Sequence, residues 1–156
     1  MVAWLRLLRV EMKVERDLGE QLKRWGLNNA QFDVLAHVGA DEGITQQRLA
    51  DSLLVTKGNV AQLLDRMQRH GLIERRPEGR TNRLFLTEEG RQVFAEAVPA
   101  HENLIDEHLS VLSKEEQTWL FELLRRLDRA LDGKSSAAGD RRDPKAVDRK
   151  LQRQRR

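Results

Sequence analysis

Near the start of the chain, apolar residues recur at helical spacing, with Arg, Lys and Glu between them. This pattern is typical of an amphipathic helix, and it predicts a first helix over about residues 3–25. Gly26 follows and is expected to end the helix, because glycine readily adopts the left-handed conformation found at many helix ends.

Two short helices are predicted next. Asn28 and Gln31 have the spacing of a capping box, in which each side chain accepts a hydrogen bond from the backbone N–H group of the other residue. A second helix should therefore begin here and run up to a loop expected over residues 39–43, which has a glycine at each end. A third helix is predicted over residues 46–52, with Thr45 as its cap.

The fourth predicted helix, residues 57–70, separates an apolar side from a polar one. With about 100° between successive residues, its aliphatic side chains gather on one side, whereas Gln62 and Arg66 lie opposite and Asn59 lies on the flank. Asn and Gln can bond to adenine and Arg to guanine in the major groove of DNA. Asn59, Gln62 and Arg66 are therefore candidates for base contacts; the alternative is an ordinary solvated helix face.

A charged hairpin is predicted directly after this helix. Residues 72–87 contain two strand-like runs, joined through a loop expected at residues 77–82. The hairpin carries Arg76, Arg80 and Arg83, and Arg is suited to phosphates and to a narrow minor groove. The alternative is an edge hairpin kept soluble by its charges. Beside a polar and mostly basic helix, we favour contact with DNA.

Charge is distributed unevenly along the chain. The formal net charge is only +3, but residues 44–87 hold eight basic and four acidic residues. Residues 88–132 hold five basic and eleven acidic ones. The predicted fourth helix and hairpin therefore lie in the basic part of the folded chain, to which a polyanion such as DNA would be drawn.

Composition excludes several classes of protein. The 156 residues are enough for one domain with a core, and the absence of cysteine excludes disulfides and thiolate chemistry. No apolar run approaches the roughly 18 residues of a membrane span, and the charged start does not resemble a signal peptide, so we expect a cytoplasmic protein. We find no catalytic triad motif, Gly-rich phosphate loop or HExxH motif, and we expect no enzyme activity.

Two long helices are predicted after the hairpin. From Glu88 onwards, apolar and His residues alternate three and four positions apart. Ser113 and Glu116 then form a capping box, and a stripe of leucines with Trp119 follows to about residue 132. These apolar stripes could be buried by helices of the same chain, but they offer more apolar surface than a small DNA-binding lobe can bury. We favour a homodimer in which the first and last helices also form a two-fold interface.

Several segments together resemble the MarR family of bacterial transcription regulators. In order along the chain they are LNNAQFDVL from Leu27, ITQQRLA from Ile44, VTKGNV from Val55, LDRM from Leu64, HGLIER from His70 and LTEEG from Leu86. The match in order and spacing covers roughly residues 5–132. The resemblance implies a mainly α fold of the α+β winged helix class, with six helices and a two-stranded hairpin as the wing. It also implies a homodimer that binds a pseudo-palindrome in double-stranded DNA, usually as a repressor released by a small ligand.

On this basis we expect dimerisation helices at residues 1–25 and 88–132, a DNA-binding lobe at residues 28–87 and a basic tail at residues 133–156. Contacts to the DNA backbone are expected from Thr45, Gln46, Thr56, Lys57, Arg69, Arg76, Arg80 and Arg83. One departure from the family is visible. The wing is about three residues shorter, and Glu78-Gly79-Arg80 occupies the place of its usual Asp-x-Arg.

A ligand pocket is expected where the dimerisation helices meet the lobe, with an aromatic or phenolic compound as the candidate effector. Five residues near that junction are candidates to line it, although they could equally be core: Met12, Arg16, Trp25, His37 and His101. His101 and His108 are separated by about 10.5 Å along a helix, which is too far for one Zn²⁺ within a chain. The alternative is a site that uses a partner helix, with His37, Glu102 or Glu107, but we favour hydrogen-bonded histidines and expect no metal or other cofactor.

The tail, residues 133–156, holds nine basic and three acidic residues and almost no large apolar side chains. It cannot bury enough surface to fold alone, and it could attract phosphates or only aid solubility. The main alternative function for the whole chain is a winged-helix module that binds another protein. Such a module would lack the steep salt dependence of DNA binding.

Overall fold

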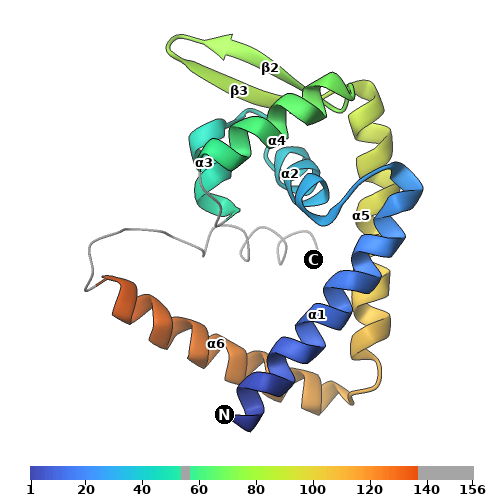
Figure 1. Ribbon diagram of the computed structural model, residues 1–156, viewed down its shortest axis with the longest axis vertical. Helices are drawn as coiled ribbons and strands as arrows, with labels where there is room; N and C mark the ends of the chain where they lie inside the picture. Colours follow the sequence, from blue (N-terminus) through green and yellow to red (C-terminus); the bar gives the residue numbers. More distant parts are fainter. Residues whose placement is uncertain (54–56, 137–156) are drawn as a thin grey trace.

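The computed structural model describes residues 1–53 and 57–136 (Figure 1). Six α-helices, a 3₁₀ turn and three short strands make up these two ranges. In chain order they are α1 (Val2–Leu22), η1 (Lys23–Trp25), α2 (Asn29–Ala40), β1 (Ile44–Thr45), α3 (Gln46–Ser52), α4 (Lys57–Arg69), β2 (Ile73–Glu78), β3 (Thr81–Leu86), α5 (Glu88–Leu109) and α6 (Lys114–Ser136). The expected class, a mainly α winged helix, is confirmed.

The elements form a lobe and a stem. In Figure 1, α2, α3, α4 and the sheet gather in the upper part, and the hairpin of β2 and β3 projects from it beside α4. Helices α1 and α5 run side by side down from this lobe. Helix α6 then leaves the lower end of α5 and extends to one side. Helices α1, α5 and α6 together form the stem, and the lobe lies at one end of it.

The sheet has three antiparallel strands in the order β1-β3-β2, one more than expected. Strand β1 is only two residues long, and it pairs Ile44 with Leu84 of β3. The expected loop over residues 77–82 is wrong, because the strands continue through it and pair Pro77 with Asn82. Proline is tolerated there since β2 is an edge strand. The wing is thus a regular ribbon that turns at Gly79, whose φ is +60°.

Local capping signals define most helix starts. The capping box at the start of α2 is confirmed, with 3.0 Å bonds in both directions between Asn28 and Gln31. Thr45 caps α3 as predicted, and its hydroxyl accepts a bond of 3.2 Å from the backbone N–H of Arg48. The capping box of Ser113 and Glu116 at the start of α6 is confirmed as well. These local patterns were sufficient to locate where three helices begin.

Helix ends were predicted less well. Helix α2 continues to Ala40, so the prediction that Gly39 begins a loop is wrong. Gly39 instead allows α2 to approach α5, because a Cβ there would lie 2.4 Å from the ring of Phe94. The first helix gives way to the 3₁₀ turn at Lys23, and Gly26 then ends it with a φ of +66°. Helix α6 runs beyond residue 132, the predicted end, to Ser136.

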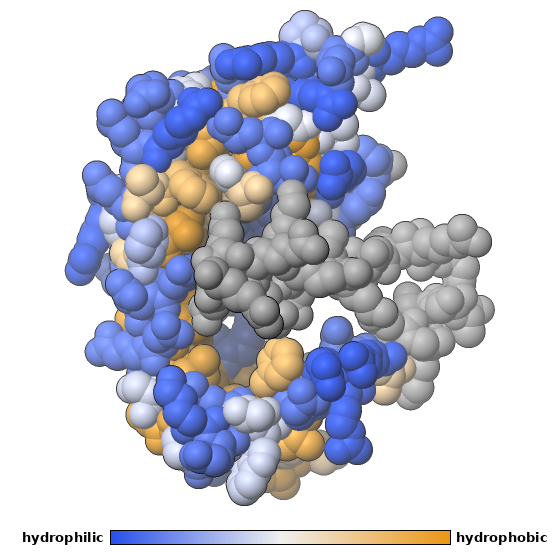
Figure 2. All heavy atoms as spheres, turned by 180° about the vertical axis from the view of Figure 1, so that it is seen from behind, coloured by the Kyte–Doolittle hydropathy of each residue, from blue (hydrophilic) through white to orange (hydrophobic). Residues whose placement is uncertain are grey.

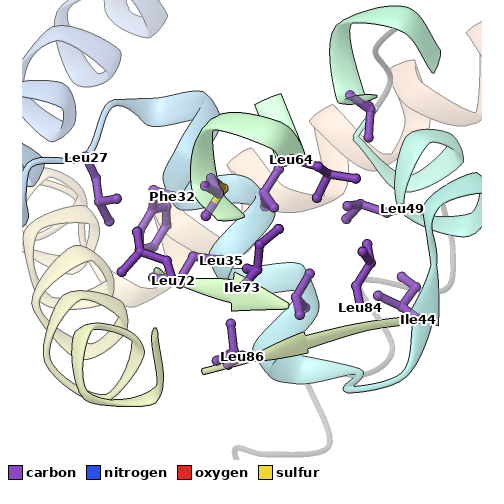
Figure 3. Packing of buried hydrophobic residues seen from close by; sticks show 14 of the residues in the cluster. Leu27, Phe32, Leu35, Ile44, Leu49, Leu64, Leu72, Ile73, Leu84 and Leu86 are labelled. Carbon is purple, nitrogen blue, oxygen red and sulfur yellow. The ribbon is translucent and has the colours of Figure 1, made fainter. Parts of the chain in front are cut away.

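One hydrophobic core holds the lobe together (Figure 3). In the close-up, Leu35 of α2, Leu64 of α4 and Leu84 of β3 point toward one another between the helices and the sheet. All three are fully buried. Burial of a leucine side chain stabilises a fold by about 1.5–3 kcal/mol. This shared core fixes α4 and the wing relative to each other.

The stem leaves many large apolar side chains exposed. Those on α6 include Trp119 at 68% and Leu123 at 59% relative exposure. The N-terminal half of α1 adds Val2, Trp4, Leu5, Leu7, Leu8 and Val10. Figure 2 shows apolar residues among hydrophilic ones at this lower end of the molecule. No helix in the described part of the chain has the length and apolar character needed to cross a membrane.

Candidate nucleic-acid interface

Helix α4 has a buried face and an exposed face, as predicted from its angular pattern. Val60, Leu64 and Met67 are fully buried in the core of the lobe. Asn59, Gln62, Arg66 and Arg69 are exposed. The helix is therefore anchored through one side and presents amide and guanidinium groups on the other. Such groups are suited to hydrogen bonds with base edges and phosphates.

An arginine that the sequence analysis did not single out joins this helix to the wing. Arg75 of β2 donates to Asp65 at 2.6 Å and to Gln68 at 3.1 Å, both on α4. It also donates to the backbone carbonyl of Ala61 at 3.4 Å. The Arg75 side chain is 21% exposed and that of Asp65 is 58% exposed, so the ion pair is shielded from water on the Arg75 side only. No local signal in the sequence distinguishes Arg75 from its basic neighbours.

The three wing arginines that were predicted to face DNA have different surroundings. Arg76 forms an ion pair with Glu74, and its guanidinium lies 4.3 Å from the centre of the Phe85 ring. Arg83 forms an ion pair with Glu78 and donates to the backbone carbonyl of Gly43 at 2.9 Å.

Arg80 is exposed at the turn of the wing. Within residues 1–53 and 57–136 its side chain has no hydrogen-bond or ion-pair partner. It is thus the arginine of this hairpin that can contact another molecule without breaking a contact inside the lobe.

The expected backbone contacts around α3 and the start of α4 are only partly described. Thr45 and Gln46 are half-buried at the start of α3, where the Thr45 hydroxyl already caps the helix. Lys57 is the first residue of α4, but its side chain lies outside the described structure, as does the whole of Thr56. In Figure 1, α3 and α4 lie on the side of the lobe from which the wing projects. The candidate surface is therefore formed by adjacent elements.

Two adjoining cavities lie where α1 crosses α2. The larger one, the stem groove, has a volume of about 720 Å³, and Met12 and Arg16 line it. The smaller one, of about 330 Å³, is lined by residues of α1, α2 and α5, including His101. We call it the α1–α2–α5 pocket.

The two other candidates for the ligand pocket, Trp25 and His37, line neither of these cavities. The Trp25 indole donates to Glu96 of α5 at 3.0 Å. The Nδ1 atom of His37 lies 2.7 Å from the backbone carbonyl of Asp33, one turn earlier in α2. Of the five predicted residues, three therefore line one of the two cavities, and Trp25 and His37 form contacts elsewhere in the chain.

Burial changes the titration of two groups in the α1–α2–α5 pocket. It raises the pKa of the Asp33 carboxyl, an effect that His37 partly offsets and Glu15 reinforces. It lowers the pKa of His101, whose ring stacks on Phe32 with a centroid distance of 4.0 Å. His101 is consequently neutral at pH 7, because its pKa lies below the ordinary value.

The sequence of the chain was compared with those of known protein families and proteins. A family model described as the MarR family matches residues 25–83. Over 128 residues the chain is 34% identical to an uncharacterized HTH-type transcriptional regulator from Bacillus cereus. That match covers 80% of this chain and 85% of the relative. The similarity therefore extends well beyond the winged helix into the stem.

Solved structures show the same fold. AbsC, a MarR family transcriptional regulator from Streptomyces coelicolor, superposes with a TM-score of 0.78 at 24% identity, covering 85% of this chain and 93% of AbsC. A variant of MarR from Escherichia coli, complexed with operator DNA, gives a TM-score of 0.72 at 29% identity. That match covers 78% of this chain and 91% of MarR. The chain therefore belongs to the MarR family of helix-turn-helix transcriptional regulators.

Proposed function

We propose that this protein is a dimeric, ligand-responsive repressor that binds a pseudo-palindromic operator in double-stranded DNA. The main support is the exposed polar face of α4, which lies beside the wing; Arg80 at the turn of the wing has no partner within the part of the chain that the structure describes. A face of this kind on a helix that is anchored from behind fits the major groove. The complex of the related MarR variant with operator DNA supports the same reading.

Base contacts are assigned to Asn59, Gln62 and Arg66 of α4. Their side chains are exposed, and they lie three and four residues apart, so they share one side of the helix. Arg would bond to guanine, and Asn or Gln to adenine, through two hydrogen bonds each. These three residues would set the sequence preference.

Contacts to the DNA backbone are assigned to residues around this helix and to the wing. Arg69 and Arg80 are exposed and are the best placed of these. Thr45, Gln46, Thr56 and Lys57 would act near the starts of α3 and α4, where backbone N–H groups favour a phosphate. Arg76 and Arg83 would have to leave their acidic partners, so we assign them mainly to shaping the wing.

A dimer is proposed because α1 and α6 expose a large apolar surface. Trp4 of α1 and Trp119 and Leu123 of α6 are each more than half exposed in the single chain. A two-fold axis through this surface would cover it with the same surface of a second copy. The two α4 helices would then meet half-sites about one DNA turn apart, or roughly 34 Å.

Ligand response is proposed because the cavities lie between the stem and the lobe. The stem groove and the α1–α2–α5 pocket both adjoin α1 and α2, so a bound molecule would act on the angle between the two parts. A ligand that favours one angle would change the spacing of the two α4 helices. It would thereby change operator affinity by its preference between the two states.

Selection of bound fragments from random DNA tests this function. We expect enrichment of an inverted repeat whose half-sites lie about one helical turn apart. If a dimer neutralises about eight phosphates, log K should fall with log salt at a slope near −7. Failure to enrich any inverted repeat, together with a flat salt response, would favour a protein-interaction module instead.

A further inference from the structure

The α1–α2–α5 pocket combines an apolar wall with an acidic lining. Val14 and Leu18 of α1 contribute the aliphatic part. Phe32 and His101 contribute two stacked rings, and His101 is neutral at pH 7. The remaining lining residues are the carboxylates Glu11, Glu15 and Asp33, together with Asn29. A cavity of about 330 Å³ is within the range that small organic molecules occupy in proteins.

The charge of this pocket differs from that of the adjoining stem groove. Among the described residues that line the pocket there are three carboxylates and no Lys or Arg. The stem groove instead contains Arg16 and Lys23 together with acidic residues, so its charges balance more closely. An anion that entered the α1–α2–α5 pocket would meet three like charges without a compensating cation. Electrostatics thus opposes aromatic acids and phenolates there.

The polar groups that line the pocket are mainly hydrogen-bond acceptors, which favour a positive charge beside them. The backbone carbonyl of Glu15 already accepts a bond of 3.0 Å from the Asn29 side-chain amide. The side-chain oxygen of Asn29 is buried, and it has no partner within the described structure. Asp33 and Glu15 are exposed residues at the mouth of the pocket; partial burial raises the pKa of Asp33, His37 partly offsets this, and the nearby charge of Glu15 adds to it. A positive charge next to these groups would relieve the repulsion between them.

The sequence led us to expect an aromatic or phenolic effector; we propose more narrowly that the α1–α2–α5 pocket binds a small organic cation with an apolar or aromatic body. The apolar body would pack on Phe32 and His101. The cationic group would lie among Glu11, Glu15 and Asp33. An aromatic face adds further attraction for a cation.

We also expect cation binding to change the affinity for DNA, and this expectation rests on the proposed function. The pocket takes residues from α1 of the stem and from α2 of the lobe, so an occupant holds these helices at one separation. We expect the cation to favour a lobe spacing that does not fit the operator. Bound cation would then lower the affinity for the operator, and bound operator would lower the affinity for the cation by the same factor, as linkage requires.

Calorimetric titration of the full-length protein tests the ligand class. The probes are benzyltrimethylammonium, whose charge does not depend on pH, benzyl alcohol as the neutral analogue and benzoate as the anion. We expect benzyltrimethylammonium to bind more tightly than the other two. Tighter binding of benzoate than of the cation would overturn the proposal.

Charge-removing variants make the test specific to this pocket. Glu15→Gln and Asp33→Asn should each weaken benzyltrimethylammonium binding by about threefold or more, and the double variant by about tenfold or more. Neither side chain forms a hydrogen bond within the described structure, so both variants should fold. Asp106→Asn, on the exposed surface of α5, removes the same charge outside the pocket and should change binding by less than about twofold. Equal effects of all three substitutions would overturn the proposal.

The effect on DNA is measured with the operator recovered by fragment selection. Saturating benzyltrimethylammonium should weaken operator binding by the wild type about fivefold or more, and should change it little in the double variant. An unchanged wild-type affinity at saturation would overturn the regulatory part. Operator binding without any probe tests the proposed function separately. If it failed, calorimetry would still decide whether the pocket prefers a cation.

Discussion

At the residue scale, side chains that look alike in the sequence have different roles in the structure. Arg75, Arg76, Arg80 and Arg83 all lie in one short basic hairpin. Arg75 contacts α4, Arg76 and Arg83 contact acidic residues of the wing, and Arg80 has no ion-pair partner among the described residues. The sequence predicted that the wing is basic. It did not predict which arginine is available, because each partner is determined by strand register and by packing across the lobe.

Gly90 provides a stability test at this scale. A Cβ at Gly90 would lie 1.9 Å from the backbone carbonyl oxygen of Leu72, so a side chain there forces α5 away from the turn after α4. We expect Gly90→Ala to lower the free energy of unfolding by about 3 kcal/mol or more. Urea denaturation followed by circular dichroism measures this change in the free energy of unfolding.

Gly79→Ala is the matched control for this substitution. Gly79 has a φ of +60°, but no atom lies within 4 Å of the added Cβ. The expected loss is about 1 kcal/mol, the usual cost of a left-handed conformation for alanine. Equal losses for the two variants would contradict the close approach of α5 to Leu72.

At the element scale, local patterns predicted the helices better than the sheet. The capping boxes at Asn28 and Ser113 are local in sequence and located the starts of α2 and α6. Strand β1 was missed because its two residues form a strand only through pairing with β3, about forty residues later. Gly39 was taken as a helix end for a similar reason. Its role depends on Phe94 of α5, which no local pattern reveals.

Arg75 is predicted to position the wing relative to α4. Removing it breaks a half-exposed ion pair with Asp65 and the bond to Gln68, and we expect Arg75→Ala to lower the free energy of unfolding by about 1 kcal/mol. A loosened wing would also place Arg80 less accurately. Operator affinity should therefore respond less to Arg80→Ala in the Arg75→Ala background than in the wild type.

A double-mutant cycle on operator affinity measures this coupling. The control is Arg76→Ala, because the partners of Arg76, Glu74 and Phe85, lie within the wing itself. That substitution should leave the effect of Arg80→Ala nearly unchanged. Additive effects of Arg75→Ala and Arg80→Ala would show that Arg75 does not position the wing.

At the scale of the whole molecule, charge and apolar surface are separated. The basic excess lies in residues 44–87 of the lobe, and residues 88–132 of the stem carry the acidic excess. The exposed apolar side chains lie mainly on α1 and α6, away from α4 and the wing. This division fits a protein that attracts DNA to one end and associates with a second copy through the other. The sequence indicated both properties, but only the fold shows that they lie at opposite ends.

Arg66→Ala tests most directly whether α4 recognises DNA sequence. Affinities for the selected operator and for a random duplex are measured at one salt concentration. Arg69→Ala is the control, since Arg69 is exposed on the same helix and is assigned to phosphate.

For Arg66→Ala we predict a loss of about 1–3 kcal/mol on the operator, relaxed preference at one base pair and little change on the random duplex. For Arg69→Ala we predict similar losses on both DNAs. Equal losses on the two DNAs for Arg66→Ala would contradict base recognition by α4.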